Sequence, residues 1–271
     1  NLQAQARKEI KKIFEENLEK KNIKFKSSNS FSTPKRLVFL FDGIPEKIEQ
    51  KEKILKGPKV GAPEIALKGF LNSNNLSKSD VYEKDLEKGR FYFAKKKSSK
   101  IDVFNELSSI IPNVLKSYSW KKNMKWSNYD LRWPRPLKSI SALFNNRIIK
   151  FDFFHIKSSN LVFKDDELDE RSKKIINFTS YVNFLKSNNV ILDQVKRKMV
   201  IVSKFNKICK SRKFKNNFSE KLIEEVTNMV ENPNILIGKF DKIFLKVPHE
   251  ILVITMQQHQ KYFPLFDEED N

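Results

Sequence analysis

The sequence predicts an α+β fold in which short mixed or antiparallel strands pack with helices, and the second half of the chain is the more helical. Apolar residues recur at helical spacing over residues 2–20 and again over residues 103–118. A continuous apolar run at Leu37–Phe41 and a hairpin pattern over residues 81–95 are typical of strands. Hydrophobic residues make up 39% of the chain and aromatic residues 12%, which is enough for a core and excludes wholesale disorder.

In the first half, the helix over residues 2–20 precedes the strand at Leu37–Phe41, which we expect to be covered on both faces. Residues 42–63 are charged and punctuated by glycine and proline, a pattern that predicts a loop or linker. Val81–Leu86 and Arg90–Lys95 then form the predicted hairpin.

The helix over residues 103–118 contains Pro112, which should kink or split it. A helix over Leu137–Asn145 and a strand over Arg147–Phe154 are expected next. Residues 158–174 are polar and charged, so they predict an exposed turn or a weak helix.

The second half carries further helical patterns and two short strand patterns. Helices are predicted over Tyr181–Ser187, Gln194–Phe214, Leu222–Val230 and Pro248–His259, and strands over Asn234–Gly238 and Tyr262–Phe266. We therefore expect an α+β module over residues 1–157, a mainly helical region over 158–231, and a strand–helix–strand unit over 232–271 that can pack back on the first module.

The charge of the chain indicates an anionic partner, although a second explanation is equally good. The 53 Lys and Arg residues against 33 Asp and Glu give a net charge of +20, which favours nucleic acid. Only 9 of the basic residues are Arg, however, and the prevalent Lys, Asn, Phe and Ile share AT-rich codons. An AT-rich genome would therefore produce the same surplus of lysine without selection for binding.

Composition excludes two classes of protein. The longest apolar runs have about four or five residues, far short of the ~20 that cross a bilayer, so we expect no membrane span and no membrane partner. The single cysteine, Cys209, cannot form an internal disulfide, and a structural role for it is favoured over a reactive one. No basic-then-apolar leader opens the chain, so we expect a cytoplasmic piece of a longer protein.

The sequence shows no catalytic or metal-binding motif. His155, His249 and His259 are separated, and neither a phosphate-binding loop nor a nucleophile elbow occurs. The acidic cluster Asp165–Glu170 predicts a solvated face rather than a magnesium site. We therefore expect no catalytic residue, no metal and no cofactor on this chain.

One patch combines aromatic and guanidinium groups within ten residues: Trp126, Arg132, Trp133 and Arg135. Such a mixture can stack on bases and hold phosphates. In the alternative, both tryptophans anchor a core and the arginines pair with local carbonyls or Asp130. Composition alone favours the alternative.

A second patch ends a predicted helix with polar side chains and turns into a strand. We expect Met256, Tyr262 and Phe263 to be largely buried there. The roles of His259 and Gln260 are uncertain from the pattern. For His259 we favour hydrogen bonds that hold the turn together over contact with substrate.

Three blocks of the chain share a known pattern. Residues 224–264 contain E-V-T, V-E-N-P, G-K-F, F-L-K-V-P-H-E and M-Q-Q-H-Q-K-Y-F. Two shorter blocks are Thr33–Leu37, T-P-K-R-L, and Met124–Pro136, which contains M-K-W and R-W-P-R-P. The three blocks, in this order, closely resemble the β subunit of bacterial glycyl-tRNA synthetase of the α2β2 type.

The resemblance implies the non-catalytic β-subunit portion of a glycine–tRNA ligase, an aminoacyl-tRNA synthetase that charges tRNA(Gly) with glycine. Activation with ATP and Mg would belong to the α subunit, while the β subunit supplies tRNA binding and contacts with α. The RNA-binding candidates are Arg36, Lys125, Arg132, Arg135 and Lys261 for phosphates, and Trp126, Trp133 and Tyr262 for stacking. Alternatives are an assembly module that docks α without contacting RNA, and a stand-alone RNA-binding protein.

The chain also departs from the family pattern. Lys138 and Ser139 stand where the family usually has His and Trp, and Asn232 replaces a common Trp. The family's G-H-R-F segment has no counterpart in residues 158–171, so the role of that segment is in doubt here.

Overall fold

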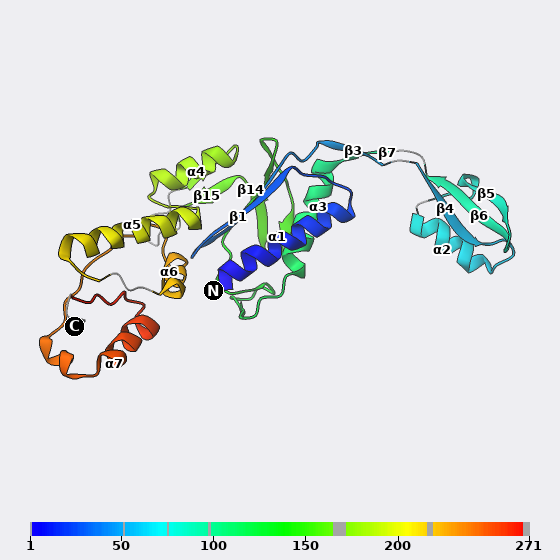
Figure 1. The fold of residues 1–271 in the computed structure, drawn as a ribbon. Coiled ribbons are helices and arrows are strands. Elements are labelled where there is room, and N and C mark those ends of the chain that lie inside the picture. Colours follow the sequence, from blue (N-terminus) through cyan, green and yellow to red (C-terminus); the bar gives the residue numbers. More distant parts are fainter. Residues whose placement is uncertain are drawn as a thin grey trace. The chain divides into compact units, whose positions relative to one another are not determined.

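The fold is given by a computed structural model, which describes residues 2–50, 52–74, 76–96, 99–164, 172–215 and 219–267. The chain forms two compact units, one of residues 1–44 with 107–271 and one of residues 45–106 (Figure 1). These units differ from the three regions expected from the sequence, whose boundaries stay a prediction. Helices and short strands occur in both units, which confirms the α+β class.

The unit of residues 45–106 contains a three-stranded antiparallel sheet and a helix. The sheet has the order β4 (Lys53–Lys59), β6 (Gly89–Lys96) and β5 (Val81–Leu86). Helix α2 (Glu64–Asn74) contacts β4. The β5–β6 hairpin confirms the predicted one, and its turn needs Gly89, which has a φ of +115°.

Residues 42–63 were expected to be a loop or linker, and this prediction is wrong because two strands lie there. Strand β3 (Lys47–Gln50) pairs with β7 (Ser99–Asp102), and β4 pairs with β6. Both partners come much later in the chain, so the local pattern did not indicate them. The backbone N–H of Val103 donates to the carbonyl of Glu46 at 2.9 Å, which joins the two ends of this unit.

The other unit begins with helix α1 (Leu2–Lys20) on the antiparallel hairpin of β1 (Ser27–Thr33) and β2 (Arg36–Asp42). The ring of Phe14 lies 5.3 Å from that of Phe39, centroid to centroid, and therefore joins helix and hairpin. The buried residues of α1 are Ala6, Ile10, Phe14 and Leu18.

The other face of the hairpin is also covered. Phe31 and Val38 pack against a buried cluster that includes Tyr181, Phe184 and Leu185 of α4. The prediction that Leu37–Phe41 is a strand covered on both faces is therefore confirmed.

The described residues between 137 and 174 form short strands rather than the predicted helix and turn. The predicted helix over Leu137–Asn145 is wrong because Asn145 and Asn146, with φ of +47° and +62°, make a tight turn between paired strands. Residues 158–174 include strands in place of an exposed turn or weak helix, and Asp165–Glu170 lie outside the described residues. The strands are β10 (Ile140–Ser141), β11 (Leu143–Phe144), β12 (Arg147–Ile148), β13 (Asp152–Phe153), β14 (Ile156–Ser159), β15 (Leu161–Phe163) and β16 (Ser172–Lys174).

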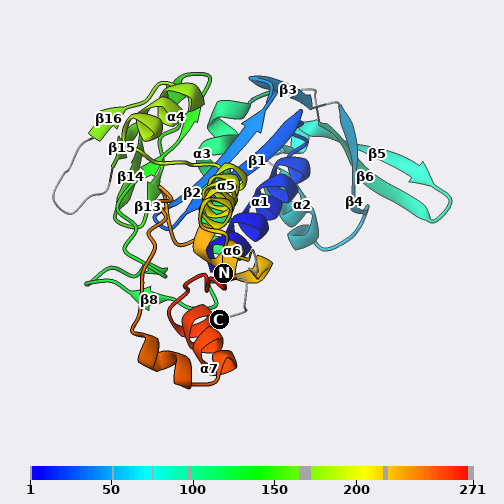
Figure 2. The same cartoon turned by 60° about the vertical axis from the view of Figure 1, so that its left-hand side comes forward.

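The helices are closer to expectation. Helix α3 (Val103–Ser117) runs through Pro112 without a break, so the expected split does not occur. Helices α4 (Phe178–Ser187), α5 (Gln194–Arg212) and α6 (Glu220–Thr227) confirm their predictions. Helix α5 contacts both α6 and β1 (Figures 1 and 2).

The last part of the chain lacks the two strands expected there. Residues 234–240 have no regular structure, and Leu236 is 84% exposed. Helix α7 (His249–Ile254) continues into a π-helical turn at Thr255–His259. Beyond it, Phe266 makes an isolated antiparallel bridge with Lys215.

Candidate functional site

The family-like residues Arg36 and Glu231 meet in a buried polar cluster. The Arg36 guanidinium binds the Glu231 carboxylate, and its second terminal nitrogen donates to the carbonyls of Phe163 and Lys164 at 3.0 and 2.6 Å. The hydroxyl of Thr33 donates to the same carboxylate at 2.5 Å. Arg36 is therefore occupied by protein groups, and the structure does not present it for a phosphate.

A second arginine, Arg197, lies fully buried in the same region. Its guanidinium donates to the carbonyls of Ile191 and Leu192 at 2.7 Å, Thr227 at 3.2 Å and Ser32 at 2.6 Å. Burial lowers the pKa of Arg197 to about 10, which still leaves it charged at neutral pH. The side chain thus ties strand β1 to the start of α5 and the end of α6.

Sequence reasoning missed Arg197 although a signal was present. Ile201, Phe205 and Cys209 follow it at intervals of four along the buried face of α5. A basic residue in such a row predicts either a helix boundary or a buried cation with several acceptors.

The two candidate tryptophans combine packing with partial exposure. Trp126 donates its indole N–H to the carbonyl of Trp133 at 2.8 Å, across the hairpin of β8 (Met124–Lys125) and β9 (Arg132–Trp133). The ring of Trp133 meets buried Trp120 edge to face at 4.8 Å. This geometry favours the core-anchoring alternative for both.

The basic candidates of the same segment are exposed. Lys125 pairs with Asp130 at 2.9 Å, and Arg135 donates to the carbonyl of Pro34 at 3.1 Å. Arg132 lies beside Lys125 on the paired strand. Arg132 and Arg135 are therefore accessible to an anion. The hydrogen bond from Arg135 to Pro34 also joins the Met124–Pro136 block to the Thr33–Leu37 block.

The C-terminal patch is more open than expected. Tyr262 is 61% exposed, so the prediction that it is buried is wrong, and Met256 and Phe263 are only half-buried. Phe263 contacts Phe205 of α5, with ring centroids 5.4 Å apart. One face of the turn therefore packs on α5 and the other stays open.

Lys261 and His259 differ in their surroundings. Lys261 binds Glu225 of α6 at 2.6 Å, and this hydrogen bond lowers the pKa of the carboxyl. His259 and Gln260 are exposed, and within the described part of the chain the His259 side chain makes no hydrogen bond or ion pair. The expectation that His259 holds the turn by hydrogen bonds is therefore wrong for this structure.

Other chemistry gets little support from the described residues. Cys209 is buried, and burial raises the pKa of its thiol, which supports the structural role. Among these residues no three His, Cys, Asp or Glu side chains gather as they would around a metal ion, and none of the helices is long and apolar enough to cross a membrane.

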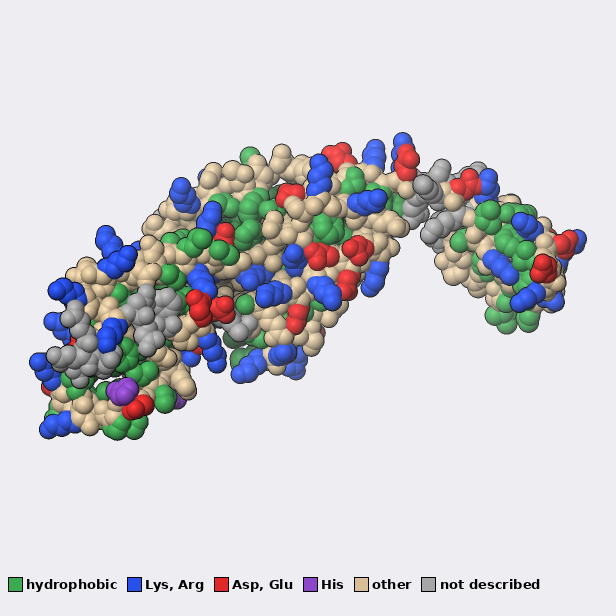
Figure 3. Space-filling model, in the orientation of Figure 1, with side chains coloured by type: hydrophobic (Ala, Val, Ile, Leu, Met, Phe, Trp, Pro, Cys, Tyr) green, Lys and Arg blue, Asp and Glu red, His purple; other side chains and the backbone are tan. Residues whose placement is uncertain are grey.

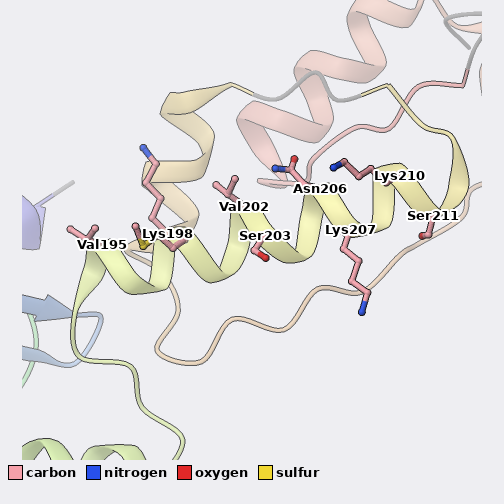
Figure 4. Close-up of a pocket in the computed structure, with 9 residues that line it drawn as sticks. Val195, Lys198, Val202, Ser203, Asn206, Lys207, Lys210 and Ser211 are labelled. Atoms are coloured by element: carbon pink, nitrogen blue, oxygen red, sulfur yellow. The ribbon is translucent and has the colours of Figure 1, made fainter.

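The surface is basic without a single focus. Lys and Arg side chains are spread over the face of the molecule shown in Figure 3. An open groove follows the outer side of α5, where Val195 and Val202 lie among Lys198 and Lys207 (Figure 4). Because one helix supplies all of its described lining, this groove is shallow.

Comparison with known proteins gives one consistent result. The family model described as "Glycyl-tRNA synthetase beta subunit" matches residues 1–271. The glycine–tRNA ligase β subunit of Rickettsia typhi is 35% identical over 252 residues, 93% of this chain and 38% of the relative. That of Rickettsia prowazekii is 35% identical over 266 residues, 98% of this chain and 40% of the relative. The chain therefore spans about two fifths of the length of these relatives.

Proposed function

Because the chain belongs to the glycyl-tRNA synthetase β-subunit family, we propose that it is a portion of a glycine–tRNA ligase β subunit that binds tRNA(Gly) and associates with an α subunit. In this proposal α carries glycine activation with ATP and Mg, and the assembly is α2β2 in the cytoplasm. The match along the whole chain carries the proposal.

The exposed cations support the part of the proposal that concerns tRNA. Arg132 and Arg135 reach solvent, and the chain has a net charge of +20. Neutralising phosphates releases counterions, so a surface of this kind binds RNA even without base contacts.

Exposed apolar side chains support association with a protein partner. Many of them belong to the segment of residues 236–262, which lies within the best-matched block of residues 224–264. Exposed apolar surface is typical of sites that contact another protein segment. The most exposed members are Leu236, Phe240, Ile243, Phe244, Ile251 and Tyr262. This observation also favours the second candidate function, an assembly module that docks α without contacting RNA.

Binding experiments separate these functions. The chain is produced with and without an α subunit, and we measure co-purification, binding of a tRNA(Gly) transcript at several salt concentrations, and glycine-dependent ATP–pyrophosphate exchange. We expect co-purification, salt-dependent tRNA binding and no exchange by the chain alone. Co-purification without tRNA binding would establish the assembly module, tRNA binding without an α complex would establish a stand-alone RNA-binding protein, and exchange by the chain alone would overturn the division of labour.

A further inference from the structure

Two hairpins of the larger unit bring aromatic rings together at the surface. The rings of Tyr129 and His155 stack with centroids 3.6 Å apart and planes 12° apart. Tyr129 follows β8 in a turn closed by its N–H to the carbonyl of Trp126, and His155 lies between β13 and β14. Tyr129 is 47% exposed and His155 is also exposed, so the stack keeps open area for another ring.

The residue before His155 extends this surface at a conformational cost. Phe154 is 48% exposed and has a φ of +54°, a left-handed conformation that is unfavourable for a bulky side chain. At the comparable tight turn this chain uses Asn145 and Asn146, which tolerate positive φ. The Phe154 ring packs edge to face on buried Phe153, with centroids 5.1 Å apart, but about half of the residue stays in solvent. Burial therefore offsets only part of the conformational cost, which indicates a role outside folding.

One cation lies near the Phe154 ring, and further basic residues occur in the segment that carries Tyr129. The ammonium group of Lys116 lies 5.8 Å from the centre of the Phe154 ring. The segment of residues 119–136, which carries Tyr129, has one acidic residue, Asp130, and five exposed basic ones. The basic residues are Lys121, Lys122, Lys125, Arg132 and Arg135.

From this arrangement we propose that Tyr129, Phe154 and His155 form a platform on which unpaired RNA bases stack, while the basic residues of the segment 119–136 hold the adjoining phosphates. This proposal rests on the proposed tRNA function and adds a site to it. Unpaired nucleotides fit better than duplex RNA because only an unstacked base offers its face to a side chain. The hairpin cations supply the sequence-independent part of the affinity.

The test compares platform variants with a matched control from the other unit. Phe154→Asn suits the left-handed backbone and removes the ring, and Tyr129→Ala removes the other platform ring. Tyr82→Ala is the control, because Tyr82 is a 42% exposed tyrosine that stacks on Phe93 in the unit of residues 45–106. Circular dichroism melting checks that all variants fold.

The probes are a tRNA(Gly) transcript, a single-stranded 12-nucleotide RNA containing 2-aminopurine, and a blunt RNA duplex of equal length. We expect each platform variant to bind the single strand about five- to a hundred-fold more weakly, because stacking on an aromatic ring contributes that much per base. The quenching of 2-aminopurine should fall together with the affinity for the single strand. The platform variants should bind the duplex like the parent, and the Tyr82→Ala control should bind all three probes like the parent.

The outcomes separate this proposal from the one on which it rests. If the parent chain binds no tRNA, the proposed tRNA function fails and the platform with it. If the parent binds tRNA while folded platform variants bind the single strand and quench like the control, the platform is wrong and tRNA binding stands. If Tyr129→Ala fails to fold, Phe154→Asn alone decides.

Discussion

The Arg36 guanidinium binds the Glu231 carboxylate across 195 residues of sequence, and both side chains are more than four fifths buried. The pair joins the turn of the first hairpin to the segment after α6. Two residues that match the family pattern in separate blocks thus contact each other.

Replacing Glu231 with Ala should destabilise the chain by about 3–5 kcal/mol, because it leaves the buried Arg36 guanidinium without its carboxylate. Chemical denaturation measures this. Asp130→Ala is the matched control, since the Lys125–Asp130 pair is exposed and should cost under about 1 kcal/mol. Equal effects of the two changes would contradict the buried-pair interpretation.

Tyr181 should make stability fall at alkaline pH. Burial raises its pKa to about 12, whereas an unfolded tyrosine titrates near its ordinary value of about 10. The folded state therefore holds more protons between these values, and stability decreases as pH rises through this window, by at most about 2–3 kcal/mol for this group. Urea denaturation from pH 9 to 11.5 should show a shallower decline for Tyr181→Phe than for the parent, and equal slopes for the two chains would contradict this role of Tyr181.

Phe263→Ala should cost about 1–3 kcal/mol, less than the 3–5 kcal/mol of a fully buried phenylalanine, because the ring is half-buried against Phe205. Tyr262→Ala, at a position 61% exposed, should change stability by under about 0.5 kcal/mol. Thermal and urea unfolding of both variants measures the difference, and a larger loss for Tyr262 would show that this turn has another packing.

The double change Arg132→Ala, Arg135→Ala should weaken tRNA binding and flatten its salt dependence. If each arginine neutralises one phosphate, the slope of log K against log salt should fall in magnitude by about 1.4–1.8. Fluorescence anisotropy over a salt series measures it. Lys84→Ala, Lys88→Ala, in the other unit, removes the same charge and is the control; a folded arginine variant that keeps the parent slope would make both arginines structural.

His259→Ala should melt at the parent temperature, because the exposed imidazole makes no described hydrogen bond or ion pair. The informative readout is then charging of tRNA by the complex with α. Lost charging at unchanged melting temperature would make His259 functional, and a lowered melting temperature would restore its structural role. Gln257→Ala on the same π-helical turn is the control.

Local patterns were sufficient for some elements and insufficient for others. Helices α1 and α6 followed from apolar spacing because each buries one stripe against its neighbours. Strands β3 and β4 did not, since they depend on partners far along the chain. The helix predicted over Leu137–Asn145 does not form, because Asn145 and Asn146 reverse the chain between two paired strands.

Residue types also predicted the candidate site only in part. A family-like arginine can contact phosphate or hold the fold, and sequence cannot separate these roles for Arg36 and Arg132. The structure buries the first and exposes the second. The stack of Tyr129 on His155 joins two hairpins and had no signal in either segment alone.

The backbone hydrogen bond between Val103 and Glu46 has a consequence for which segment of the chain can be deleted. Since Glu46 and Val103 are hydrogen-bonded to each other, residues 47–102 between them form an insertion whose removal leaves ends close enough for a short linker. The chain shortened in this way should keep the melting transition of α1 and its hairpin. The inserted segment should likewise be replaceable by the corresponding segment of a related protein.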